Sequence, residues 1–328
     1  MATQLTVFTD RSYRAYTEVI TDAVRLFNEA SRGTILLSST DMISGGFSEN
    51  VFYKSIPNLV KRRLPLSTNP ITKVSMAHER ATSIRLPFRT DEVELPQYMY
   101  DWINRNVTEA AGVFGKQLAE QTFAAYLERT VDMLVAAMIT HTDVVYDATG
   151  LAGDLAKTNY VNLSNGAGKF GDRASLIRAW FMSSGAWRSM LNNNLDNNDA
   201  LFSFGTVNVK TDAEGRPIII TDAQGFDDGV AAPNKKLYSL GLVAGAAAIG
   251  ELPDRRANTE VKNGFENILT TYQAQWSVLA DIQGYRFDTT QITDSTAASD
   301  AAIAASANWT RNVTSHKDTA GVLVITKQ

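Results

Sequence analysis

The stretch that decides the fold is TEAAGVFGKQLAEQTFAAYLERTVDMLVAAMIT, residues Thr108–Thr140. Residues that would share one helix face recur along it at Phe114, Leu118, Phe123, Leu127, Thr130, Leu134 and Met138. Thr108 followed by Glu109 is a good helix start. At ~1.5 Å per residue, such a stretch makes a rod of roughly 50 Å. We therefore predict one long helix. The alternative is two helices broken at Gly112 or Gly115.

The region before this helix, residues 41–96, has the opposite character. It holds five of the eight prolines, Pro57, Pro65, Pro70, Pro87 and Pro96. Proline prevents helix formation and removes hydrogen-bond donors from strands. Alternating apolar residues at 74–76 and 84–88 favour strands with one exposed face. We predict a long extended β-hairpin. Because an isolated two-stranded hairpin is marginally stable in water, it must lie on its own domain or on a neighbouring subunit.

The rest of the chain predicts a mixture of helices and strands. Apolar residues between Tyr13 and Phe27 recur at three- and four-residue steps, which predicts a helix capped at Gly33. Residues 143–172 are rich in Asn, Asp and Gly and predict loops. Ser183 is placed to cap a helix after a short strand. Further strands are predicted at Thr34–Ser39, Ala179–Met182, Phe202–Val209, Pro217–Thr221, Leu237–Leu252, Gly264–Asp288 and Gly321–Thr326.

No residue pattern supports catalysis or a cofactor. The chain has no cysteine, and its three histidines show no spacing of paired metal ligands. Residues Gly166–Gly171 match G-x-G-x-x-G, but the acid-ended strand that a dinucleotide site needs downstream is missing. No run approaches the ~18 apolar residues of a membrane span. We therefore expect no catalytic, cofactor-binding or metal site, and a protein that is not an enzyme.

The formal net charge of −4 hides strong charge segregation. Residues 52–90 carry eight bases and one acid, so this segment is +7 and the rest of the chain is −11. A basic block of this kind can be a solvated face, and the interleaved aromatics of a single-strand nucleic-acid binder are missing. We predict instead a basic arm that lies on an acidic neighbouring subunit. The predicted interface residues are Lys54, Lys61, Arg62, Arg63, Arg80, Arg85, Arg89, Glu92 and Glu94.

The order of these elements is similar to that of the major capsid proteins of tailed phages, which have the Hong Kong 97 fold. Residues Phe52–Arg63 resemble the start of that family's extended loop, and Thr108–Thr140 resemble its spine helix. Residues Ala179–Leu191 look like the strand and helix of its axial domain, and Leu237–Glu251 look like the central axial strand. Residues Asn308–Val322 resemble the closing segment. The resemblance covers nearly the whole chain.

This resemblance implies an α+β fold of the Hong Kong 97 type. Its parts would be an N-terminal arm (1–40), an extended β-hairpin loop (41–96), a peripheral domain with the spine helix (97–149 and 256–294) and an α/β axial domain (150–255 and 295–328). The implied function is that of a structural protein. Assembled in the host cytoplasm, it would form the pentamers and hexamers of an icosahedral phage head that encloses double-stranded DNA.

The implied partners are further copies of the chain, a scaffolding protein, a portal, a decoration protein in shells that carry one, and the packaged DNA, bound without sequence preference. No membrane partner is implied. Some family members have a long N-terminal scaffold-like domain that this sequence lacks, so we expect a separate scaffolding protein. Two alternatives stay open at this point. One is an encapsulin-type nanocompartment shell, and the other is a hydrolase or carbohydrate-binding protein with a site built from loops.

Overall fold

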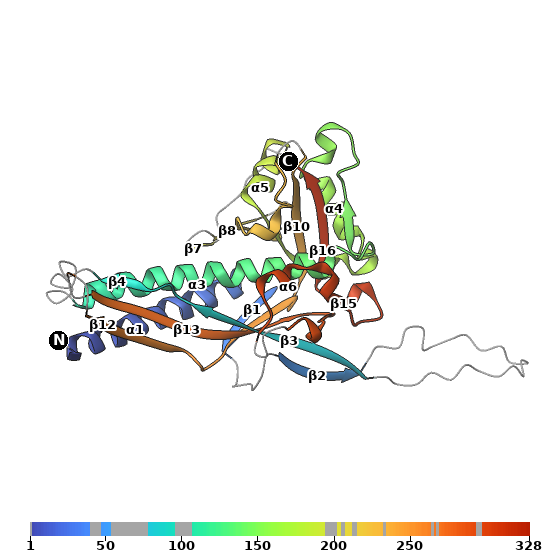
Figure 1. Ribbon diagram of the computed structural model, residues 1–328. Helices are drawn as coiled ribbons and strands as arrows, with labels where there is room; N and C mark the ends of the chain where they lie inside the picture. Colours follow the sequence, from blue (N-terminus) through green and yellow to red (C-terminus); the bar gives the residue numbers. More distant parts are fainter. Residues whose placement is uncertain are drawn as a thin grey trace, which may run out of the picture.

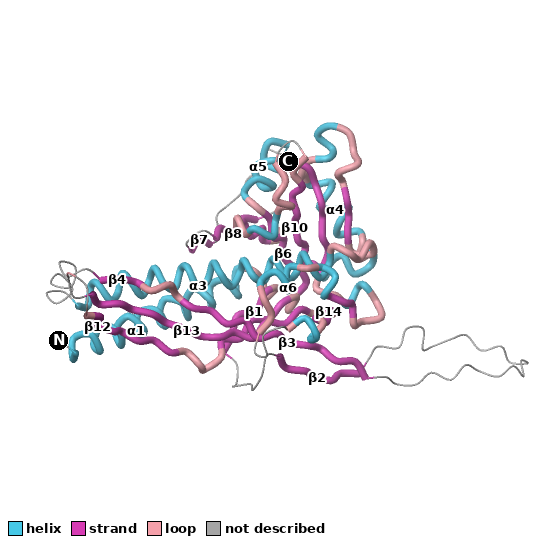
Figure 2. The backbone as a smooth tube through the Cα atoms, in the orientation of Figure 1, coloured by secondary structure: helices cyan, strands magenta, loops and turns pink. Residues whose placement is uncertain are grey.

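The structure is a computed structural model. It describes residues 2–39, 47–53, 78–95, 107–193, 202–204, 207–211, 215–231, 234–263, 266, 269–292 and 297–328. Two long helices lie against a sheet in an elongated lower part, and a second sheet stands above one end of the longer helix (Figure 1). Figure 2 shows the same arrangement coloured by secondary structure. The fold is thus mixed α+β, as expected from the sequence.

Helix α3, Val107–Met138, is unbroken. The predicted long helix is therefore confirmed and the two-helix alternative is wrong. Helix α1, Ala2–Ala30, packs beside α3 and runs in the same direction (Figure 1). Gly115 marks a close approach, because a Cβ atom there would lie 2.7 Å from the backbone oxygen of Ser12 and 2.9 Å from the Cβ of Ala15. This glycine permits the contact between the helices and does not interrupt α3.

The first sheet lies against these helices and is built around strand β13. Among the described residues its strands run in the order β1-β11-β13-β3-β2, and β12 and β4 also pair with β13. The β1–β11 pair is parallel and the others are antiparallel. The strands are β1 (Ile35–Ser39), β2 (Phe47–Tyr53), β3 (His78–Arg89), β4 (Val93–Leu95), β11 (Ala247–Glu251), β12 (Arg256–Lys262) and β13 (Leu269–Ile282).

Side chains on β13 alternate between the two faces of this sheet. Tyr272, Trp276 and Val278 are buried, whereas Gln273 and Gln275 are exposed. This is the period-two pattern of a strand with one face toward a core. The buried face packs toward the helices, so the opposite, outer face of the sheet is open to contacts from outside the chain.

The predicted hairpin is present in the part of the chain that the structure describes. Strands β2 and β3 are antiparallel, with Phe47 opposite Ile84 and Tyr53 opposite His78. In β3, Ile84 and Leu86 are buried. The alternation at 84–88 is therefore confirmed, while residues 54–77 lie outside the described residues.

The second sheet forms the upper part of the molecule. Its described strands run in the order β5-β16-β10-β6-β9-β8-β7. Helix α5, Ser184–Asn193, follows β6, and the side chain of Ser183 accepts a hydrogen bond from the backbone N–H of Ala186, which confirms the predicted cap. The strands are β5 (Val145–Asp147), β6 (Ile177–Met182), β7 (Phe202–Phe204), β8 (Val207–Thr211), β9 (Pro217–Ile220), β10 (Lys236–Val243) and β16 (Gly321–Lys327).

Two predictions for this upper part were wrong. Residues 143–172 are not all loop, because they contain helix α4, Tyr160–Gly168, capped by the side chain of Asn159. The G-x-G-x-x-G match therefore falls at the end of a helix. The tract Leu237–Leu252 is two strands in different sheets, since the chain turns at Gly245, which has a φ of 69°. The backbone N–H of Gly245 donates to the oxygen of Gly33 at 2.8 Å.

One apolar core joins the two sheets through α3. The ring of Phe27 in α1 lies 5.2 Å from that of Phe123 in α3 and 6.5 Å from that of Phe181 in β6. Beside this core, β14 (Tyr285–Phe287) pairs with β15 (Trp309–Arg311), and α6 (Asp300–Ala304) contacts α3.

The glycines of α3 allow a matched test of the helix contact. We expect Gly115→Ala to lower the free energy of unfolding by about 1–3 kcal/mol, because the added methyl group overpacks the contact with α1. Gly112→Ala is the control, since a Cβ there meets no atom within 4 Å. It should raise stability by up to ~1 kcal/mol through helix propensity. Chemical denaturation of the unassembled chain measures both, and equal effects would contradict the role of Gly115.

Candidate interaction surface

The predicted interface residues that the structure describes lie on β3 and around β4. Arg80, Arg85 and Arg89 are in β3, Glu94 is in β4 and Glu92 precedes it. The remaining predicted residues, Lys54, Lys61, Arg62 and Arg63, lie outside the described residues. Where the structure describes them, the predicted residues thus lie on or beside two strands that both pair with β13.

Strand register places several of these residues on the outer face. Arg89 and Arg256 are the two Cα partners of Gln275, one on each side of β13. Glu94 and Glu260 flank Thr271 in the same way. Directly paired residues share a face of the sheet. The outer face therefore carries a basic row at position 275 and an acidic row at position 271.

Arg85 is already paired within its own chain. Its Nη2 donates to Oδ2 of Asp254 at 2.6 Å, and Oδ1 of Asp254 accepts from the backbone N–H of Ser277 at 2.9 Å. Partial burial alone would raise the pKa of Asp254, but the hydrogen bonds from Ser277 and Arg85 hold it below its ordinary value. This pair joins β3 to the connection between β11 and β12.

The other charged groups of this face are more open to solvent. Lys262 donates to Glu92, which lowers the pKa of Glu92 and raises that of Lys262. Arg89 lies 3.9 Å from Asp91, and their side chains are 71% and 95% exposed. An ion pair so exposed contributes little to stability because solvent and salt screen it. Arg89 is therefore available to a further partner.

A buried arginine, which the sequence analysis did not identify, lies on the inner face of the same sheet. The Arg255 side chain is 8% exposed, and its Nη1 lies 3.2 Å from Oε1 of Glu251. Its guanidinium carbon lies 3.7 Å from the ring centroid of Tyr16 and 4.5 Å from that of Trp276. Burial raises the pKa of Tyr16 to about 12. This stack connects α1 to β13 through cation–π contacts.

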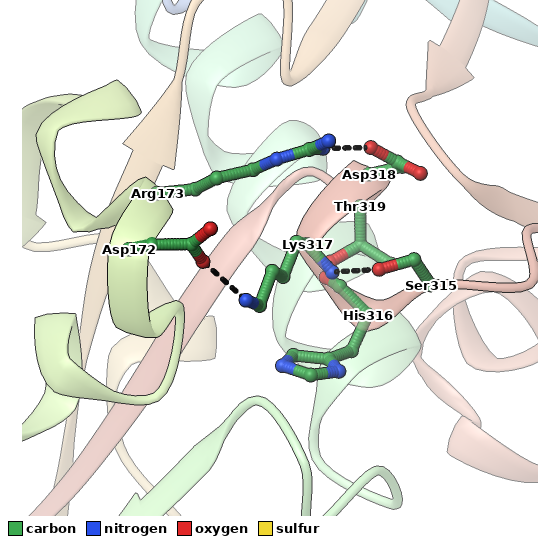
Figure 3. A network of polar contacts seen from close by, with 7 residues as sticks. All are labelled: Asp172, Arg173, Ser315, His316, Lys317, Asp318 and Thr319. Atoms are coloured by element: carbon green, nitrogen blue, oxygen red, sulfur yellow. Dashed lines mark hydrogen bonds and ion pairs between the residues drawn. The ribbon is translucent and has the colours of Figure 1, made fainter. Parts of the chain in front are cut away.

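A separate set of ion pairs ties the upper sheet to the C-terminal segment (Figure 3). Lys317 pairs with Asp172, and Arg173 pairs with Asp318. The hydrogen bond from Lys317 lowers the pKa of Asp172. These four side chains connect the short 3-10 helices Gly171–Leu176 and His316–Asp318.

The histidines occupy separate structural positions. Nε2 of His316 lies 3.2 Å from the backbone oxygen of Lys169, and the ring of His141 lies 5.5 Å from that of Tyr285. His78 is in β3.

No group of three or more potential metal-ligating acids and histidines occurs among the described residues. In the same part of the chain, no helix is long and apolar enough to cross a membrane.

Replacing the buried arginine tests its structural role. We expect Arg255→Met to destabilise the fold by roughly 1–3 kcal/mol, because Glu251 then stays half-buried without its partner. Arg256→Met, at an exposed neighbouring position, should change stability by less than about 0.5 kcal/mol. Chemical denaturation of both variants checks this, and an equal effect would contradict the role of Arg255.

The pH dependence of the Arg255→Met variant follows from Glu251. Burial raises the pKa of Glu251, and Arg255 opposes that increase. A carboxyl group with a raised pKa contributes stability that is full below its unfolded-state pKa and is lost as pH rises through the folded-state pKa. Removing Arg255 raises this pKa further. The stability deficit of Arg255→Met should therefore be smaller near about pH 4 than near about pH 7. Adding Glu251→Gln should abolish this difference.

Solved structures of phage proteins resemble this chain at low identity. A chain from the capsid of Ralstonia phage GP4 is 8% identical with a TM-score of 0.48, covering 90% of this chain and 88% of that chain. A chain from Mycobacterium phage Cain is 13% identical with a TM-score of 0.46, covering 75% and 82%. A chain from the Cyanophage Pam1 capsid asymmetric unit is 10% identical with a TM-score of 0.45, covering 88% of each. No curated protein matches the chain.

The match to a family model extends over almost the whole sequence. The model for major capsid protein 13-like proteins matches residues 4–323, which include nearly all of both sheets and of both long helices, together with the hairpin strands. The chain belongs to this family of phage major capsid proteins.

Proposed function

We propose that copies of this chain form the pentamers and hexamers of an icosahedral phage head, and that this head encloses double-stranded DNA. Membership of the major capsid protein family carries this proposal. An elongated subunit with an open sheet face and a hairpin at its edge suits side-by-side packing in a shell (Figure 1). The further partners that we propose are a scaffolding protein, a portal and a decoration protein.

We further propose that the basic residues of the hairpin region contact a neighbouring subunit. The sequence between β2 and β3 carries Lys54, Lys61, Arg62, Arg63 and Lys73, and it contains no acid. Strand β2 forms the edge of its sheet, paired only with β3 among the described strands. The region between these strands therefore begins and ends at the margin of the subunit, where a neighbour can be reached.

The acidic row on the outer face is the acceptor that fits this basic segment. Glu94 and Glu260 are exposed and lie on opposite sides of Thr271. The two carboxylates lie two strand spacings apart, about 10 Å, so cationic side chains from a neighbour can pair with each of them. Lys61, Arg62 and Arg63 are consecutive in the sequence, so this segment brings three long cationic side chains to such a contact.

We also propose a division of the chain into arm, hairpin loop, peripheral domain and axial domain. The two sheets support the separation of the last two parts. Strand β11 pairs with β1 and β13, which belong to the first sheet. This pairing favours a boundary at the Gly245 turn over one at residue 255, with Ala247–Glu251 in the peripheral domain.

Electron microscopy tests the assembly. When the full-length chain is produced with its scaffolding protein, we expect closed icosahedral shells in which pentameric and hexameric units can be resolved. Small oligomers or monomers of uniform size, with the scaffolding protein present, would contradict the proposal. Light scattering on the same samples gives an independent measure of particle mass.

Charge reversal tests the basic segment. We expect Arg62→Glu with Arg63→Glu to impair shell assembly, because both side chains would repel the acidic row of the neighbour. The folding of the unassembled chain, followed by circular dichroism, should be unchanged. Arg62→Lys with Arg63→Lys is the matched control and should assemble normally. Normal shells from the glutamate variant would refute the contact.

A further inference from the structure

A carboxylate near the end of β13 is buried without a charged partner. Asp281 lies between Ala280 and Ile282, which are both buried on the inner face, so strand alternation places Asp281 on the outer face of the first sheet. Its Oδ1 atom is nevertheless buried, and no group of the described chain forms a hydrogen bond with this atom. Burial raises the pKa of Asp281, and a contact with the backbone of Ile282 opposes this only in part.

Asp281 lines a pocket that has room for a side chain from outside the subunit. The pocket has a volume of about 360 Å³, which is within the range of sites that hold ligands. It lies between the turns at Gly245 and Gly284 and residues Asn312 and Val313. None of the described residues that line it is basic.

The other carboxylate of this pocket is already engaged. Asp318 also lines the pocket, but it pairs with Arg173 (Figure 3). No such ion pair engages Asp281 within the described residues, although its Oδ1 atom is buried. Asp281 is therefore the carboxylate in this pocket that has capacity for a cation.

A buried carboxylate without a cation lowers the stability of the isolated subunit. Removing a charge from water costs free energy, and a cation placed beside the charge offsets this cost. A divalent metal ion fits poorly here, because it requires about six or more oxygen ligands. A lysine or arginine side chain can instead be held by a single carboxylate.

The chain itself carries the cations that such a pocket requires. The sequence between β2 and β3 holds five basic residues and no acid. We propose that, in the assembled protein, the pocket binds a lysine or arginine side chain of a second copy of this chain, with Asp281 as the acceptor. This inference rests on the proposed self-assembly, but it does not require the proposed contact with Glu94 and Glu260.

The stability of the unassembled full-length chain gives the first test. We expect Asp281→Asn to shift the midpoint of chemical denaturation to a higher denaturant concentration, because a neutral amide of the same shape removes the buried charge. Asp10→Asn is the matched control at an exposed position of α1, and it should leave the midpoint unchanged. A lower midpoint for Asp281→Asn would show that Asp281 already has a partner within its own chain. An unchanged midpoint would show that solvent satisfies the carboxylate. Either result would overturn the proposal.

Shell formation gives the second test, with the opposite sign. When the scaffolding protein is present, Asp281→Asn should lower the yield of closed shells at least about threefold although the subunit is more stable, because the lost ion pair recurs at each contact between subunits. Asp10→Asn should assemble like the unmodified chain. A normal shell yield from Asp281→Asn would contradict the proposal and leave the proposed function intact.

A peptide titration tests the pocket without shells. The probe is a fluorescein-labelled peptide of three arginines, and its binding to the unassembled chain is followed by fluorescence anisotropy. Asp281→Asn should weaken this binding at least about fivefold, whereas Asp10→Asn should not change it. Equal binding by both variants would exclude Asp281 as the acceptor. If calcium raises the denaturation midpoint of the unmodified chain but not that of Asp281→Asn, and the peptide does not bind, the pocket is a metal site instead. Failure of the unmodified chain to form shells would contradict the proposed function, and this titration would still decide the role of the pocket.

Discussion

The structure depends on one helix that is buried from two sides. The first half of α3 has exposed positions, such as Val113 and Lys116, on the side away from α1 and the first sheet. Its second half has none, and its last six residues, Met133–Met138, are all apolar and all buried. A helix that is apolar all around must be covered all around. Two layers are therefore required at this end of the helix, and the second sheet supplies the second one.

Much of this architecture could be predicted from the sequence, because it follows from local periodicity. Helical spacing located α1 and α3, alternation located β3, and the strand predicted at Gly264–Asp288 contains β13. Helix α4 was missed because Asn159 and Asn162 read as loop residues, although one caps the helix and the other donates to the backbone oxygens of Leu155 and Lys157. The split between β10 and β11 was missed because pairing partners, not local pattern, decide which sheet a strand joins.

The functional class was predictable for a different reason. The order of elements resembled the tailed-phage capsid family, and the family match confirms it. The protein is thus a structural component of the virion capsid, and the enzyme and nanocompartment alternatives were wrong. The interface residues stay a prediction. A sequence shows how much charge a segment carries, but it does not show which charges are already paired across long sequence separations, as Arg85 and Asp254 are.

This pairing changes the interpretation of the charge segregation. The basic segment 52–90 carries +7 in the sequence, yet Arg85 is paired within the chain, and so is Glu92 just beyond the segment. What remains for contacts outside the subunit is therefore more localised than the totals suggest. It consists of the basic residues between β2 and β3, the basic row of Arg89 and Arg256, and the acidic row of Glu94 and Glu260.

The connection between β11 and β12 links the hairpin to the N-terminal helix. Asp254 faces the outer side of the sheet and pairs with Arg85 of β3, whereas the next residue, Arg255, faces the inner side and stacks on Tyr16 of α1. Ser277 holds this connection to β13 through its backbone bonds to Leu252 and Asp254. Asp254 holds β3 and the next residue, Arg255, holds α1. A shift of β3 along β13 would therefore break the Arg85–Asp254 pair and strain the adjacent contact of Arg255 with α1. The turn at Asp254–Arg255 therefore couples the position of β3 to that of α1.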